Sequence, residues 1–165
     1  MDWTAKLVDA ASDCDLQSLK DALKNGADIN ARYGDSTALI DAVDCGNVEI
    51  VKYLVENGAD MENMNNIWGN TALMKIANSV CIQESETCIE IARYLLDKGA
   101  NINAKTCNGW TALMYASSYG YLDMVKFLVK NGADINAITD EGYTALNVAL
   151  NKEVENFLIE AGAKR

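Results

Sequence analysis

Residue types that support catalysis are scarce or poorly arranged in this sequence. Its 165 residues contain no histidine, the commonest general base and a common metal ligand. The 24 aspartates and glutamates are plentiful, but none stands at a fixed spacing from a nucleophile, a base or a glycine-rich phosphate loop. Asp41, Asp44 and Asp123 are typical of solvated helix positions. We therefore expect no enzyme activity, no catalytic residues and no cofactor.

The five cysteines are the other candidates for chemistry. They are irregularly spaced, at Cys14, Cys45, Cys81, Cys88 and Cys107. A structural zinc site needs Cys or His pairs about two to four residues apart, and Cys81 and Cys88 are farther apart than that. The odd number of cysteines favours free thiols in a reducing compartment, so we expect a cytoplasmic location. We also expect no metal site. The alternative is a disulfide between Cys81 and Cys88, which would require an oxidising compartment.

The charge balance argues against nucleic acids and anionic membranes as partners. The chain has 24 acidic against 14 basic residues and a formal net charge of -10. Nucleic-acid affinity comes largely from lysines and arginines that displace counterions, so an acidic chain is repelled by phosphates. No apolar run approaches the roughly 20 residues of a membrane-spanning helix. The first residues also lack the pattern of a signal peptide.

Two short motifs recur along the chain in a fixed order. Gly-Ala-[Asp/Asn]-[Ile/Met] begins at Gly26, Gly58, Gly99 and Gly132, with a truncated copy at Gly162. The successive intervals are 32, 41, 33 and 30 residues. Thr-Ala-Leu begins at Thr37, Thr71, Thr111 and Thr144. Two landmarks around a period near 33 residues indicate a stacked repeat protein.

One complete unit, residues 104 to 136, predicts how each repeat folds. Thr111 can cap a first helix by accepting hydrogen bonds from free backbone N–H groups. Gly120 breaks that helix, and the apolar residues within 122 to 129 form a second one. Gly132 then supplies the left-handed conformation that often ends a helix. Such a unit must stack on its neighbours, because each large aliphatic side chain removed from water contributes about 1.5–3 kcal/mol.

The pattern Thr-Ala-Leu-x-x-Ala, Gly, Leu-x-x-Val-x-x-Leu-x-x-x-Gly-Ala-Asp-Ile-Asn-Ala resembles the ankyrin repeat, over essentially the whole chain. The resemblance implies an all-α ankyrin-repeat solenoid of about five stacked helix-turn-helix units with short β-hairpin-like turns. The family's Thr-Pro-Leu-His loses its Pro and His in every copy, where Ile40, Met74, Met114 and Asn147 replace the His. The helix start tolerates alanine. Loss of the His is expected to remove a hydrogen bond that braces neighbouring repeats.

Aligned on these motifs, residues 1–165 form a single ankyrin-repeat domain. The expected copies are an N-terminal capping repeat at 1–30, repeats at 31–63, 64–103 and 104–136, and a C-terminal capping repeat at 137–165. The copy at 64–103 carries an inserted loop between its helices, over residues 79–88. That loop is either neutral drift, since surface loops tolerate added length, or a docking element, since loops often carry function.

In the ankyrin family the hairpin tips and the exposed side of the first helices form a concave surface that binds protein partners. The residues at those positions here are Tyr33, Ser36, Asp41, Asp44, Ile67, Trp68, Lys75, Asn78, Trp110, Tyr115, Ser118, Tyr119 and Tyr143. Tyrosine and tryptophan give large, rigid contact area and concentrate binding energy at interfaces. The alternative is that some, especially Trp110 and Tyr143, only stack on neighbouring hairpins and stiffen the array.

These features favour a monomeric, non-catalytic scaffold that binds a partner protein, whose surface should be basic around an apolar centre. One alternative is a regulatory or inhibitory subunit of an enzyme that uses the same face. Another is a small-molecule sensor or enzyme, which would need a deep apolar pocket. The resemblance also implies that Asn30, Asn103 and Asn136 lie where the family can be β-hydroxylated in animal cells, with Glu62 at that position in the second copy.

Overall fold

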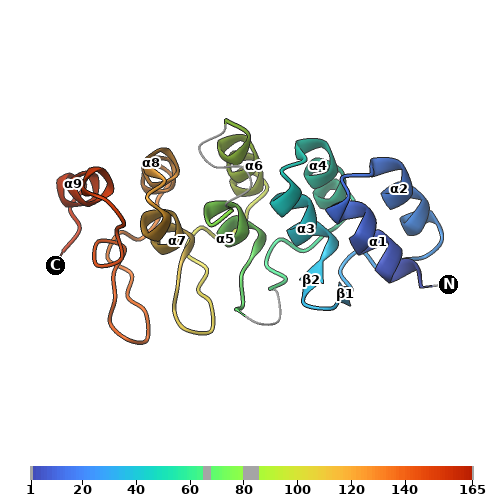
Figure 1. Ribbon diagram of the computed structural model, residues 1–165, viewed down its shortest axis with the longest axis horizontal. Coiled ribbons are helices and arrows are strands. Elements are labelled where there is room, and N and C mark those ends of the chain that lie inside the picture. The colour runs from blue at the N-terminus through green and yellow to red at the C-terminus, as the bar shows by residue number, and fades with distance from the viewer. Residues whose placement is uncertain (1, 65–67, 80–85, 165) are drawn as a thin grey trace.

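The protein is a row of stacked helix pairs, seen from the side in Figure 1. The computed structural model describes residues 2–64, 68–79 and 86–164. The first row of helices contains α1 (Trp3–Ser12), α3 (Ala38–Cys45), α5 (Ala72–Ala77) and α7 (Ala112–Tyr119). The second row contains α2 (Leu16–Lys24), α4 (Val48–Glu56), α6 (Glu86–Asp97), α8 (Leu122–Lys130) and α9 (Lys152–Glu160). These two rows confirm the expected all-α solenoid.

The recurring threonines and glycines begin and end the helices as the sequence predicts. Thr37, Thr71 and Thr111 precede α3, α5 and α7. Each hydroxyl accepts a hydrogen bond from the backbone N–H three residues on, at 3.3–3.4 Å. The recurring glycines that follow the second-row helices have φ between 89° and 97°, a conformation that glycine adopts without strain.

The core lies between the two rows and runs along the stack. Its largest fully buried side chains are Leu7, Leu19, Leu39, Ile50, Leu54, Leu73, Met74, Ile76, Ile91, Leu95, Leu113 and Met114. Met74, Met114 and the buried Ile40 occupy the position of the family's histidine. At these positions apolar packing between neighbouring helices therefore replaces a polar brace.

Side-chain hydrogen bonds join successive copies at the position of the motif asparagine. The asparagine Oδ1 accepts from a backbone N–H of the next copy, in the pairs Asn30 with Asp60 (2.7 Å), Asn103 with Asp134 (2.8 Å) and Asn136 with Lys164 (2.8 Å). Where Glu62 replaces asparagine, its Oε1 accepts from the Asn101 N–H at 2.8 Å. This position therefore braces neighbouring copies, whichever of the two side chains occupies it.

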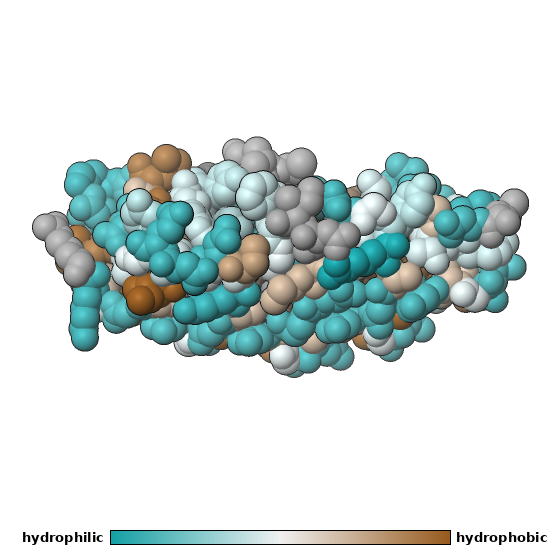
Figure 2. Space-filling model, turned by 90° about the horizontal axis from the view of Figure 1, so that it is seen from below, coloured by the Kyte–Doolittle hydropathy of each residue, from teal (hydrophilic) through white to brown (hydrophobic). Residues whose placement is uncertain are grey.

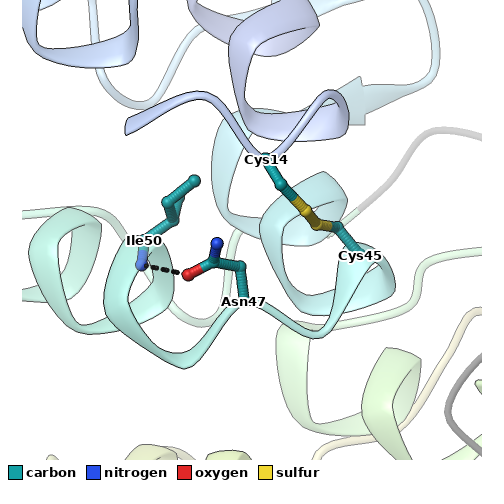
Figure 3. The surroundings of a disulfide bond; sticks show 4 residues. All are labelled: Cys14, Cys45, Asn47 and Ile50. Atoms are coloured by element: carbon teal, nitrogen blue, oxygen red, sulfur yellow. Dashed lines mark hydrogen bonds between the residues drawn. A yellow bond between two sulfur atoms is a disulfide. The ribbon is translucent and has the colours of Figure 1, made fainter. Parts of the chain in front are cut away.

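A disulfide between Cys14 and Cys45 links the first copy to the second (Figure 3), so the prediction of free thiols is wrong for this pair. Their Cα atoms lie 6.5 Å apart. Cys14 lies in the turn between α1 and α2, with φ 58°, where later copies have Gly46 and Gly120 at φ 75° and 76°. Cys45 ends α3, directly before the turn whose Asn47 caps α4. Stacking brings this turn and the end of α3 together.

The remaining cysteines do not form a described pair. Cys88 is buried, and Cys107 is an exposed free thiol. Cys81 lies outside the described residues, so the Cys81–Cys88 disulfide stays a prediction. Cys88 is within the first turn of α6, because that helix begins at Glu86, inside the loop predicted at 79–88.

The final copy differs from the expected helix pair. Residues 137–164 are all described and contain α9 but no first-row helix. Instead, residues 145–148 form a turn in which the Val148 N–H donates to the Thr144 carbonyl at 3.2 Å. The interval from Thr144 to Gly162 is 18 residues, against 21 from Thr111 to Gly132. This shortening between the helices leaves too little chain for a full first helix and a turn.

Turns project from one edge of the stack, below the first-row helices in Figure 1. In the second copy, β1 (Arg32–Tyr33) and β2 (Ser36–Thr37) form a short antiparallel hairpin with Tyr33 opposite Ser36. Backbone hydrogen bonds of 2.9 Å close the equivalent turns, donated by the Thr106 N–H to the Trp110 carbonyl and by the Thr139 N–H to the Tyr143 carbonyl. The hairpin-like turns that the sequence predicts are therefore present.

In the second row, cationic side chains of one copy lie over aromatic rings of the next copy. The pairs are Lys20 over Tyr53 (5.2 Å), Lys52 over Tyr94 (5.8 Å) and Arg93 over Phe127 (5.4 Å). Each cation–π contact of this kind contributes about 0.5–1 kcal/mol at an exposed site. The second row thus has its own contacts between copies, separate from the turns.

Candidate protein-binding surface

The predicted surface residues lie on the turns and the first-row helices, with the exception of Ile67, which is outside the described residues. The edge that carries the turns is seen from below in Figure 2, where it is mostly hydrophilic with small, separate apolar patches. The most exposed of the predicted aromatic residues are Tyr33 (48%), Trp68 (59%), Tyr119 (42%) and Tyr143 (48%). Large aromatic side chains are thus exposed on an otherwise polar surface.

Four of the predicted aromatic residues, Trp68, Trp110, Tyr115 and Tyr119, come together around one hollow of about 370 Å³ in the third and fourth copies. It is lined by Trp68, Asn70, Asn78, Thr106, Asn108, Trp110, Tyr115 and Tyr119. The rings of Trp110 and Tyr115 have centroids 5.1 Å apart. Tyr119 stacks on Tyr121, with centroids 5.6 Å apart. The rings of Trp110, Tyr115 and Tyr119 are therefore held by their neighbours before any partner arrives, which lowers the entropy cost of binding.

The hollow is electrically neutral, since none of its lining residues carries a charge at neutral pH. Burial raises the pKa of the Tyr115 hydroxyl, and Tyr119 raises it further, while a hydrogen bond with Asn70 acts in the opposite direction. Tyr115 therefore stays protonated. Sequence reasoning missed Asn70, Thr106 and Asn108, although Asn70 stands directly before Thr71, as Trp110 stands before Thr111. A comparison of these equivalent positions between copies could have identified Asn70.

The neighbouring part of the surface is acidic. Asp41 and Asp44 lie on α3, and Lys75 of α5 forms an ion pair with Asp44 at 3.1 Å. Burial raises the pKa of Asp41; a hydrogen bond donated by Ser36 opposes this, Asp44 and Asp9 raise the pKa further, and Lys75 lowers it. Asp9 was not among the predicted residues, although it holds the same position in the first copy as Asp41 in the second.

The other predicted residues lie outside the hollow. Ser118 is half-buried on α7, and its hydroxyl donates to the Tyr115 carbonyl at 2.9 Å. Tyr33 and Tyr143 lie on the turns of the second and final copies, and neither lines the hollow. The predicted residues thus form one aromatic group, one acidic group and separate tyrosines on either side.

Backbone contacts hold the last two turns together. The Asp140 N–H donates to the Asn108 carbonyl at 3.2 Å. A Cβ on Gly109 would lie 2.9 Å from Thr139 Cα, closer than side chains approach, so only glycine permits this contact. Stacking of these turns therefore does not depend on the Tyr143 ring, which is 48% exposed. Trp110 contacts Tyr115 of its own copy.

Other kinds of site find limited support in the part of the chain that the structure describes. It contains no group of three or more Cys, Asp or Glu placed to hold a metal ion, and no helix long and apolar enough to cross a membrane. A second hollow of about 280 Å³ lies beside Cys88 and Tyr121, with Glu86, Asp123 and Glu153 among its lining residues.

Comparison with known proteins agrees with the arrangement of the helices. The family model described as "Ankyrin repeats (3 copies)" matches residues 7–106, 61–139 and 79–164. The chain is 34% identical over 118 residues to the ankyrin repeat and KH domain-containing protein mask-1 of Caenorhabditis elegans, covering 72% of this chain and 4% of that protein. It is 34% identical over 111 residues to the mouse B-cell lymphoma 3 protein homolog, covering 66% and 23% of the two chains.

A third relative is the putative ankyrin repeat protein R886 of Acanthamoeba polyphaga mimivirus. It is 51% identical over 43 residues, which cover 26% of this chain and 32% of that protein. The matched regions thus span less than a third of the length of each relative, but the family match extends over nearly the whole chain. Ankyrin repeats typically act without catalysis, and they generally mediate protein–protein interactions. The chain belongs to the ankyrin-repeat family.

Proposed function

We propose that this protein is a non-catalytic scaffold that binds a partner protein through the turns and first-row helices. The observation that carries the proposal is the hollow lined by Trp68, Trp110, Tyr115 and Tyr119. Trp68 is 59% exposed and Tyr119 is 42% exposed, so the stack does not need to bury them. Exposed tryptophan and tyrosine on a rigid platform are typical of the residues that dominate binding energy at interfaces.

The surroundings of the hollow support a partner whose surface is basic next to an apolar group. The net charge of -10 attracts basic surfaces, and Asp41 and Asp44 place negative charge on the same face as the aromatic rings. Electrostatic complementarity of this kind speeds association and excludes acidic partners. Folding does not depend on the partner, since the core between the rows is formed by the chain's own residues.

Affinity capture with matched variants tests the proposal. The surface variant Trp68→Ala/Trp110→Ala/Tyr119→Ala removes three rings of the hollow. The control variant Glu49→Ala/Lys130→Ala/Ile159→Ala changes three exposed residues of the second row. Circular dichroism and thermal unfolding verify that both are folded. Because Trp110 packs on Tyr115, Trp68→Ala alone serves as a milder variant.

We expect wild type and the control variant to recover the same proteins, identified by mass spectrometry, and the surface variant to lose them. Equal recovery by all folded variants would refute the assignment of this face. If a captured partner is an enzyme, its activity with and without the scaffold separates simple binding from regulation or inhibition.

A further inference from the structure

The binding surface changes character from one copy to the next. One position of the first-row helices is occupied successively by Asp9, Asp41, Lys75 and Tyr115. The helices α1, α3, α5 and α7 stack in one row (Figure 1), so residues at a shared position of these helices follow one another along the array. The face thus has an acidic half on α1 and α3 and an aromatic half around α7, with Lys75 between them.

The acidic half carries more negative charge than its neighbours neutralise. Asp9 and Asp44 both act on Asp41, and Lys75 pairs with Asp44 at 3.1 Å. Asp41 accepts its hydrogen bond from the hydroxyl of Ser36, which is a neutral donor. A lysine or arginine brought by a partner would therefore find excess negative charge beside Asp9 and Asp41, and carboxylates are the preferred acceptors of such donors.

The aromatic half suits a different kind of side chain. The hollow of about 370 Å³ is uncharged and has the rings of Trp68, Trp110, Tyr115 and Tyr119 in its walls. A large apolar or aromatic side chain gains contact area there without desolvating a charge. Asn78 and Asn108 also line the hollow and can hydrogen-bond to the main chain of an extended peptide. A helical peptide would already have satisfied those main-chain groups internally.

The distance between the halves follows from the stacking. Asp41 on α3 and Tyr115 on α7 are separated by one intervening helix, α5. Packed helices lie about 8–10 Å apart, so the two groups are separated by roughly 16–20 Å. An extended chain advances about 3.3 Å per residue, so it covers this span in about five or six residues.

We propose that the surface recognises one extended segment of a partner protein. A lysine or arginine of that segment lies beside Asp9 and Asp41, and a large apolar or aromatic side chain about five or six residues away occupies the hollow. This inference rests on the proposed function and specifies the chemistry of its partner. The spacing is a property of the stacked array, because Asp41 and Tyr115 belong to the second and fourth copies, which are not adjacent.

A peptide selection tests the spacing. The purified 165-residue chain is used to select from a displayed library of random 12-residue peptides. A selected peptide is then synthesised with the basic and apolar residues brought three residues closer by deletion or moved three residues apart by Gly-Ser insertion. Binding is measured by fluorescence anisotropy of the labelled peptide. We expect enrichment of the five- or six-residue spacing and an affinity about tenfold lower for both altered spacings.

Variants assign the two ends of the peptide. Asp9→Asn/Asp41→Asn is expected to weaken binding about threefold to tenfold, mainly at low salt, because an ion pair at a partly exposed site is screened. Asp123→Asn, a carboxylate that is 81% exposed on the second row, serves as the matched control and should leave binding unchanged. Trp68→Ala should weaken every selected peptide, including one whose basic residue is replaced by norleucine.

The outcomes separate this inference from the proposed function. Peptides that lose affinity with Trp68→Ala, but carry no basic residue at the expected spacing or bind Asp9→Asn/Asp41→Asn equally well, overturn the inference and leave the proposed face intact. Peptides that bind Trp68→Ala and the triple surface variant as tightly as wild type overturn both. A selection that enriches no peptide also overturns the inference, since a preformed site for an extended segment should select one.

Discussion

Breaking the disulfide between Cys14 and Cys45 should destabilise the N-terminal end of the array. The two cysteines are 31 residues apart in sequence, so the bond closes a loop of that length in the unfolded chain. The loop-entropy relation gives a stabilisation of about 3.7 kcal/mol at 25 °C for such a loop. Because each copy contacts only its neighbours, the loss should appear first as fraying of α1 and α2.

The double variant Cys14→Ser/Cys45→Ser removes the bond, and urea denaturation followed by circular dichroism measures the free energy of unfolding. We expect a decrease of about 3–4 kcal/mol relative to the oxidised wild type, and reduced wild type should match the variant. Cys107→Ser, at an exposed free thiol, is the control and should leave the free energy unchanged. Alkylation under denaturing conditions should label Cys14 and Cys45 only after a reductant is added.

A companion variant isolates the backbone strain at Cys14. Cys14 has φ 58°, where an L-residue is about 1–2 kcal/mol less stable than in a right-handed conformation. Cys14→Gly/Cys45→Ser lacks the disulfide but relieves that strain, so it should be about 1 kcal/mol more stable than Cys14→Ser/Cys45→Ser. Full alkylation of both cysteines without reductant would refute the disulfide. Equal unfolding free energies for oxidised wild type and the double serine variant would refute the stability argument.

Three further predictions concern bonds between copies and the acidic half of the surface. Asn103→Ala removes the 2.8 Å hydrogen bond from the Asp134 N–H and should cost about 1–2 kcal/mol in urea denaturation, whereas Asn103→Asp keeps an acceptor and should cost less. Tyr94→Leu removes the ring below Lys52 and should cost about 0.5–1 kcal/mol beyond lost packing; a double-mutant cycle with Lys52→Met that shows no coupling would contradict this. The pKa of Asp41 is raised in the folded state, so folding favours the protonated carboxyl. Protonated Asp41 therefore stabilises the fold fully below the carboxyl's ordinary pKa of about 3.9, and this stabilisation is lost as the pH rises through the folded-state pKa. The stability of Asp41→Asn relative to wild type should therefore increase with pH in denaturation curves between pH 3.5 and 7, and a constant difference would contradict the assignment.

Local chemistry explains why much of the fold could be predicted from the sequence. The threonine caps, such as Thr111 before α7, use hydrogen bonds to residues three positions away. The glycines after the second-row helices supply a left-handed backbone at one residue. Both signals lie within a few residues of the structure that they produce, and their repetition near every 33 residues indicates stacking.

Contacts between copies were harder to predict, because they depend on the relative placement of stacked units. The 31-residue separation of Cys14 and Cys45 is close to one repeat and was the available signal for their disulfide. The odd number of cysteines argued in the opposite direction. The first-row helix expected in the final copy is absent, because the shortening between its helices removed the chain needed to form it.

The sequence by itself therefore determined the repeat and the helix pairs of the first four copies, since local propensity and apolar periodicity specify these. Only the tertiary structure decided that Trp68 and Asn70 of the third copy share a hollow with Trp110, Tyr115 and Tyr119 of the fourth. It also decided that Asp9 acts on Asp41 from the preceding copy. The physical reason is that a solenoid builds its surface from neighbouring copies, whose side chains meet only after the helices have packed.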